Sequence, residues 1–274
     1  MFDPKTKKFP YPLDTGSHYI ILKKDDGTVF DRDYPYLDKS PKMKFKQGLM
    51  RVGLYLLAFP LMRIRLGLKI KGRENLKKHK AELQNGAITC CNHVHFWDYI
   101  AVMRALIPHR LNLLAWDKNV RGENAALIRM VGGIPIPLND IHATIAFQKA
   151  LAEVLEHGWL HIYSEGSMWE YYQPIRPFKI GTAHLACKFD KPVLPLAFSY
   201  REPGFIRKKI FKQIALFTIT VGEPVYADKS LNFKERVTDL TVRLHGAVCR
   251  LAGIEPEENI YPPVYDNSQR IDYY

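Results

Sequence analysis

The stretch Cys91-Asn92-His93-Val94-His95-Phe96-Trp97-Asp98 directly follows a short apolar run, Ala87-Ile88-Thr89-Cys90. A short apolar run of this kind is typical of a buried strand. His93 and Asp98 are five positions apart. On an unbroken α-helix, that separation would leave the two side chains roughly 140° apart. They can meet only if the backbone turns between them, as it does where a strand gives way to a helix.

A histidine paired with a carboxylate suits proton transfer. An imidazole near its ordinary pKa accepts a proton at neutral pH, and a carboxylate fixes its tautomer and stabilises the imidazolium. Taken alone, this spacing arises by chance in many proteins. Its meaning therefore depends on the rest of the chain.

The composition describes a folded protein with an anionic partner. The chain has 274 residues, of which 47% are hydrophobic and 25% charged, which suits one large or two smaller globular domains. The formal net charge of +12 favours nucleic acid, an anionic membrane surface or a negatively charged substrate as the partner. No helix-turn-helix, zinc-finger or RNP-type pattern is visible, so we expect no nucleic-acid partner.

The cysteines indicate neither disulfides nor a metal site. Cys90, Cys91, Cys187 and Cys249 form no CxxC pair and have no metal-ligand spacing. We interpret Cys90 and Cys91, which lie in a predicted buried strand, as small buried thiols. The absence of a disulfide framework favours a reducing, cytosol-facing compartment.

No targeting or membrane-spanning segment is expected. The N-terminus lacks the apolar core of a signal peptide. No run of about 20 apolar residues occurs, and the nearest candidate, Gly48 to Met62, contains Arg51 and Pro60.

The chain divides into four parts. Residues 1–40 form a polar appendage with a small β-hairpin around Asp25-Asp26-Gly27. Residues 41–71 form a helical segment, residues 72–254 the main α/β domain, and residues 255–274 a polar tail.

Two basic amphipathic segments stand out. In residues 41–71, apolar side chains between positions 49 and 62 are bracketed by Lys and Arg. An interfacial helix on an anionic membrane needs this pattern, but a helix packed on the core with solvated charges explains it equally well. Residues 206–212 alternate apolar and basic side chains, and membrane contact or a solvated face would each explain them.

From Gly86 onward, predicted strands and helices alternate. This order predicts an α/β fold with a largely parallel or mixed central sheet flanked by helices. The expected strands are 87–91, 110–116, 160–163, 193–200 and 214–221, and the expected helices are 98–106, 124–131, 140–157, 181–188 and 233–252.

Four ordered blocks carry a resemblance. They are Asn92-His93 with Asp98, then Gly132-Gly133-Ile134-Pro135-Ile136-Pro137, then Tyr163-Ser164-Glu165-Gly166-Ser167 with Pro177-Phe178-Lys179-Ile180-Gly181, and last Lys191-Pro192-Val193-Leu194-Pro195. From about Lys69 to Pro224 the chain resembles the glycerophospholipid acyltransferase family, enzymes similar to lysophosphatidate acyltransferase. The ordered set of blocks is more specific than any one of them.

The resemblance implies roles for residues of these blocks. His93 would be the general base and Asp98 its orienting partner, and Glu165, Gly166 and Ser167 would form the acceptor block. The oxyanion donors would be N–H groups near Gly132–Gly133 or near Glu165–Gly166. The acyl group would come from acyl-CoA or acyl-carrier protein as co-substrate, with no metal and no tightly bound cofactor. His95 would have a packing or pocket-lining role.

The chain departs from the family where glycerol-phosphate enzymes carry two arginines. Leu138 and Met168 stand at those positions. Arg176 and Lys179 offer substitute charge, and the neighbouring aromatic residues would add apolar surface. A lysophospholipid acceptor and a glycolipid acceptor therefore both stay open.

Other functions remain as alternatives. A non-catalytic lipid-binding scaffold would retain the membrane contact, and a thioesterase-type hydrolase would replace the acceptor hydroxyl with water. No Gly-x-Ser-x-Gly elbow supports a serine nucleophile. The sequence thus predicts an acyltransferase held peripherally, as a monotopic protein, on the cytoplasmic face of a membrane, and leaves its oligomeric state open.

Overall fold

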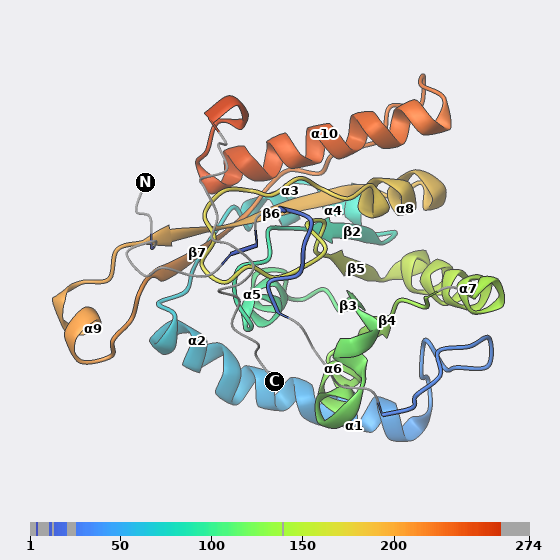
Figure 1. Ribbon diagram of the computed structural model, residues 1–274, viewed down its shortest axis with the longest axis horizontal. Coiled ribbons are helices and arrows are strands. Elements are labelled where there is room, and N and C mark those ends of the chain that lie inside the picture. The colour runs from blue at the N-terminus through green and yellow to red at the C-terminus, as the bar shows by residue number, and fades with distance from the viewer. Residues whose placement is uncertain (1–3, 5–10, 13, 21–25, 139, 259–274) are drawn as a thin grey trace.

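A computed structural model describes residues 4, 11–12, 14–20, 26–138 and 140–258 (Figure 1). The predicted β-hairpin includes residues 21–25, and most of the predicted tail lies beyond residue 258. These parts of the two predictions fall outside the described residues.

A seven-stranded sheet with the order β1-β7-β6-β2-β5-β3-β4 forms the centre of the molecule. All neighbouring strands are parallel except β6 and β7, so the predicted α/β fold with a largely parallel or mixed sheet is confirmed. The strands are β1 (Lys69–Lys71), β2 (Ala87–Cys90), β3 (Leu111–Ala115), β4 (Gly133–Pro135), β5 (Trp159–Ile162), β6 (Val193–Arg201) and β7 (Leu216–Val221).

Helices cover both faces of the sheet because its central strands are apolar on both sides. In β2, Ile88 and Cys90 join the core cluster under α7, α8 and α10, whereas Ala87 joins the cluster on the side of α2 and α5. The helices are α1 (Pro41–Gly53), α2 (Phe59–Arg65), α3 (Glu74–Lys78), α4 (Lys80–Leu83), α5 (Asp98–Ala105), α6 (Ala125–Met130), α7 (Ile141–His157), α8 (Gly181–Phe189), α9 (Phe205–Lys209) and α10 (Phe233–Ala252). Figure 1 shows α8 and α10 above the sheet and α1 and α2 below it.

Helices α1 and α2 are joined by a π-helical turn, Leu54–Ala58, into one rod. Ser40 caps its start by accepting from the Met43 N–H at 3.1 Å, and Pro41 occupies the first turn, where no N–H is needed. None of the residues of α1 is buried. The rod contacts the core through a narrow line of side chains that includes Leu54, Phe59 and Met62.

The opposite side of the rod exposes large apolar side chains. They are Phe45, Leu49, Val52, Tyr55, Leu56, Leu57, Leu61 and Ile64. No helix within the described part of the chain is both long and apolar enough to cross a membrane.

Candidate functional site

The candidate site lies where β2 ends and α5 begins, at the carboxyl end of a central strand. Between Cys90 and Asp98 the backbone makes the turn that the sequence demands. His93 Nδ1 and Asp98 Oδ2 are 2.6 Å apart. The two predicted residues of the dyad therefore meet directly.

Asp98 receives hydrogen bonds on both carboxylate oxygens. Besides His93, Oδ2 accepts from the backbone N–H groups of Val94 at 3.1 Å and His95 at 3.3 Å, and Oδ1 accepts from the Tyr163 hydroxyl at 2.5 Å. Burial raises the pKa of Asp98, but the His93 imidazole and these hydrogen bonds outweigh burial. The net pKa of Asp98 lies below its ordinary value, so the carboxylate is ionised at neutral pH.

Tyr163, at the end of β5, supports the dyad in two ways that the sequence did not reveal. Its ring stacks on the His93 imidazole, with centroids 3.7 Å apart and planes 11° apart. Its hydroxyl holds Asp98, and burial followed by the Asp98 charge raises the Tyr163 pKa well above its ordinary value. The hydroxyl therefore stays protonated and donates to the carboxylate.

His161 is a neutral buried imidazole that lies against Tyr163. It has no solvent-exposed surface, its Nδ1 lies 2.8 Å from Thr89 Oγ1, and its ring meets Tyr163 edge-on. Burial lowers the pKa of His161 to about 3. A buried, uncharged ring at this depth acts as a packing support for Tyr163.

Glu165 connects the third block to the backbone of the dyad. Its Oε2 accepts from the His93 N–H at 3.0 Å, and its Oε1 accepts from the Arg176 N–H at 2.8 Å. The Arg176 guanidinium donates to Oε2 at 3.0 Å, and both side chains are almost completely buried. Glu165 thus fixes the position of His93 through the main chain.

The N-terminal appendage covers the other side of this ion pair. Arg176 donates from Nη1 to the Thr15 carbonyl at 3.1 Å and to Ser167 Oγ at 3.0 Å. The Ser167 hydroxyl and the Trp169 indole both donate to the Ser17 carbonyl, at 3.1 and 3.0 Å. The Arg176 guanidinium is therefore held by Glu165, Ser167 and the main chain of the appendage.

The aromatic surface expected beside the third block is mostly absent from the exterior. Trp169 and Tyr172 are buried in a cluster with Tyr11 and Tyr19. The Trp169 ring stacks on Tyr11 at 5.5 Å. These aromatic side chains hold the appendage against the domain, because their packing removes large apolar rings from water.

Gly166 and Lys179 meet at the rim of the site. Gly166 has φ of 78°, a left-handed conformation that glycine adopts without steric cost, and its N–H donates to the Tyr163 carbonyl at 2.9 Å. A methyl group on Gly166 would lie 2.7 Å from Lys179 Cε, so the lysine side chain lies over the glycine. Lys179 itself is solvent-exposed.

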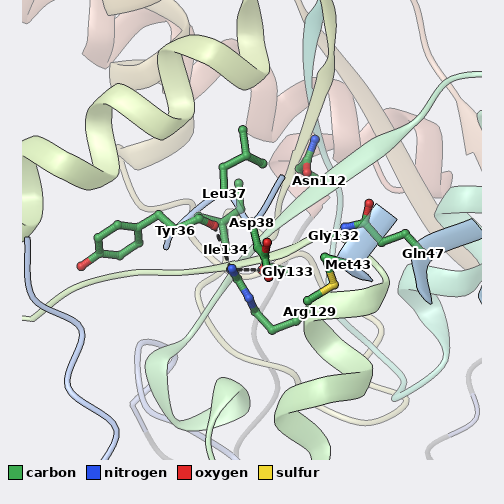
Figure 2. A pocket seen from close by; sticks show the side chains of 10 residues that line it. All are labelled: Tyr36, Leu37, Asp38, Met43, Gln47, Asn112, Arg129, Gly132, Gly133 and Ile134. Atoms are coloured by element: carbon green, nitrogen blue, oxygen red, sulfur yellow. Dashed lines mark hydrogen bonds between the residues drawn. The ribbon is translucent and has the colours of Figure 1, made fainter. Parts of the chain in front are cut away.

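Gly133 lies apart from the dyad. It belongs to β4, at the edge of the sheet, and three strand spacings of about 4.8 Å separate β4 from β2. Its carbonyl accepts from Arg129 Nη1 at 3.0 Å, and Arg129 also donates to the Tyr36 carbonyl (Figure 2). The pocket at this place has room for about one water molecule, too little for a lipid.

Two more residues of the first block have structural partners. The Asn92 side chain exchanges hydrogen bonds with the main chain of Phe198, which extends the pairing of β2 with β6. His95 accepts from the Trp97 N–H on Nδ1 at 3.1 Å, and its ring packs against Tyr171 and Phe217. This packing agrees with the role expected for His95.

The geometry equips His93 to act as a base. With Asp98 accepting from Nδ1–H, the lone pair lies on Nε2, and 22% of the His93 side chain is exposed. Across the described ranges, no group of three or more His, Cys, Asp or Glu side chains could hold a metal ion.

Comparison with a model of a known protein family agrees with the blocks of sequence. No curated protein sequence matches the chain. Among solved structures, it is similar to the crystal structure of the 1-acyl-sn-glycerophosphate (LPA) acyltransferase PlsC from Thermotoga maritima, with 15% identity, a TM-score of 0.43, and coverage of 76% of this chain and 83% of that one. Residues 67–199, which contain the dyad and the third block, match the profile of the acyltransferase family. This segment of the chain belongs to the acyltransferase family.

Proposed function

We propose that this acyltransferase moves a fatty acyl group from a thioester, acyl-CoA or acyl-carrier protein, to a hydroxyl of a lysophospholipid or related lipid. The observation that carries the proposal is the His93–Asp98 hydrogen bond of 2.6 Å, with Nε2 of the same ring left for substrate.

In the proposed reaction, His93 carries the proton from the acceptor hydroxyl to the leaving thiolate. Nε2 removes the proton from the acceptor hydroxyl as its oxygen attacks the thioester carbonyl. The tetrahedral intermediate then expels the thiolate, which takes this proton from Nε2 and leaves as the free thiol. Asp98 stabilises the imidazolium between these steps, as the carboxylate does in a serine hydrolase triad.

Within this proposal, the third block shapes the acceptor side of the site. Glu165, Ser167 and Arg176 act as a buried frame, and Gly166 forms the turn at the rim. Lys179 is the exposed cation next to that turn, so it is the residue we assign to an anionic headgroup. A glycolipid acceptor is the second candidate, because Leu138 and Met168 replace the two arginines of glycerol-phosphate enzymes.

We propose peripheral attachment to the cytoplasmic face of a membrane. The exposed apolar side of the rod formed by α1 and α2 supports attachment, and the segment Pro41–Arg65 contains Lys and Arg but no Asp or Glu. The free thiols of all four cysteines support a reducing compartment.

The test is acyl transfer by purified wild-type protein and by His93→Ala. Both donors are supplied with a panel of lysophospholipid and glycolipid acceptors. We expect product from the wild type and a loss of about 10²–10⁴-fold in the variant, which is the usual contribution of a general base. If free fatty acid forms and no acylated product does, the protein is a hydrolase and not a transferase. Vesicle binding without either product would favour the scaffold.

The acceptor is tested with Lys179→Ala. For a phosphate-bearing acceptor we expect KM to rise about tenfold with little change in kcat, since a hydrogen bond to a charged group contributes about 1.5–3 kcal/mol. An unchanged KM, or a neutral glycolipid as the best acceptor, would contradict the assignment of Lys179.

A further inference from the structure

The connection between β6 and β7 exposes an unusual amount of apolar surface. This connection, residues 202–215, contains α9 and is called the α9 loop below. Phe205, Ile206, Ile210 and Phe211 are 70%, 61%, 69% and 53% exposed. A contiguous apolar patch on an otherwise polar rim marks a surface that meets a partner or a membrane.

The charge of the α9 loop restricts the partner. The α9 loop contains four basic residues, Arg207, Lys208, Lys209 and Lys212, and one acidic residue, Glu202, which pairs with Lys208. Its net charge is therefore +3. Lys209 Nζ lies over the Phe205 ring at 4.9 Å, so cationic and apolar groups share one surface. Aromatic and aliphatic side chains interleaved with cations suit the boundary between headgroups and acyl chains of an anionic bilayer.

The α9 loop is fixed to the last turn of α2. Arg207 Nη1 donates to the Ile64 carbonyl at 3.0 Å, and Gln213 donates to the same carbonyl at 3.2 Å and to that of Arg65. Carbonyls in the last turn of a helix have no partner within the helix, so the loop acts as its cap. Figure 1 shows α9 next to α2 at one edge of the molecule.

We propose that the α9 loop is a second membrane contact that acts together with the exposed side of the α1–α2 rod and selects anionic lipid. A single interfacial helix still leaves the protein some freedom to rotate about the helix axis. A second contact, placed beyond the helix end and fixed to it, removes that freedom. The orientation of the catalytic domain over the bilayer is then set by two elements far apart in sequence. This proposal rests on the membrane attachment proposed above.

The test is flotation of the full chain with phosphatidylcholine vesicles, with and without about 30% phosphatidylglycerol. The apolar variant carries Phe205→Ser, Ile206→Ser and Phe211→Ser, and the charge variant carries Lys208→Gln and Lys209→Gln. Arg207 and Gln213 are kept because they hold the loop to α2. The matched control is Val242→Ser, which removes another apolar side chain, 66% exposed, from α10. Thermal unfolding of each variant checks that the fold is intact.

We expect the apolar variant to bind both kinds of vesicle at least tenfold more weakly. The charge variant should lose about 30-fold in affinity, and only for anionic vesicles, since each basic residue near an anionic surface contributes about 1 kcal/mol. The control should bind like the wild type.

The outcomes separate the two proposals. If the wild type and the two loop variants bind equally while Leu57→Ser with Leu61→Ser abolishes binding, the rod alone attaches the protein and the α9 loop proposal is overturned. If the wild type binds no vesicles, the membrane attachment itself fails. As a second measurement, a Phe205→Trp variant should show fluorescence quenching by brominated lipid beyond that of the wild type, and equal quenching would contradict insertion of the loop.

Discussion

The Tyr163 hydroxyl can be removed without removing the ring that stacks on His93. In Tyr163→Phe the stack at 3.7 Å remains, but Asp98 Oδ1 loses its donor. We expect kcat to fall about tenfold or more with little change in KM, because Asp98, and His93 with it, loses a positioning hydrogen bond of about 1.5–3 kcal/mol. The pH dependence of kcat is the diagnostic measurement. A carboxylate with one donor fewer stabilises the imidazolium more strongly, so the acid limb should move to higher pH.

Tyr200→Phe is the matched control for this prediction. Its hydroxyl is also buried, but it donates to the Tyr172 carbonyl, at 3.2 Å, and not to a residue of the dyad. It should change stability without moving the acid limb. If Tyr163→Phe behaves in the same way as Tyr200→Phe, the hydroxyl has a structural role and no part in positioning the dyad.

At the scale of elements, sequence patterns located the long helices and the central strands closely. The helix expected over 233–252 is α10, and the helix expected over 140–157 is α7, one residue shorter at its start. The strands β1 and β4 were not predicted as strands. Each has only three residues, too few to show a periodicity, and each forms by pairing with a neighbour distant in sequence.

The site shows the same division between local and distant contacts. His93 and Asp98 could be paired from spacing because both belong to one turn between a strand and a helix. The contacts of Tyr163 with Asp98 and of Glu165 with His93 depend on the pairing of β2 with β5, about 70 positions along the chain, which no local pattern encodes. The ion pair of Glu165 and Arg176 was missed for a related reason, because a long loop brings them together.

That ion pair gives a prediction for the loop between β5 and α8. Arg176→Met leaves the Glu165 carboxylate buried without its partner, which costs about 3–5 kcal/mol. The double variant Glu165→Gln with Arg176→Met should recover a large part of that loss, because no unpaired charge remains. Urea unfolding of the single and double variants measures this coupling. If Arg176→Met unfolds like the wild type and only raises the acceptor KM, Arg176 contacts the acceptor directly.

Over the whole molecule, the buried His161 links stability to pH. Its folded pKa of about 3 lies below the value of 6.5 expected in the unfolded chain. Between these values the unfolded chain binds a proton that the folded chain excludes. Stability is therefore full above about pH 6.5 and falls as the pH decreases, by up to about 1.4 kcal/mol per pH unit. Burial also lowers the pKa of His95 and His109. These two histidines therefore also reduce the stability of the folded protein as the pH decreases.

His161→Asn isolates the contribution of this one group. An amide nitrogen can replace Nδ1 opposite Thr89 and does not titrate, so the slope of unfolding free energy against pH should decrease between pH 6 and 4, whatever the variant loses in absolute stability. Asp98 does not interfere in this window. Its lowered pKa means that its contribution is lost only as the pH falls through a value below 3.8. Urea unfolding at a series of pH values measures the slope, and His109→Gln, at a less buried ring, should reduce it less. An unchanged slope in His161→Asn would mean that the imidazole becomes protonated inside the folded protein, and a neutral support beneath Tyr163 would then be excluded.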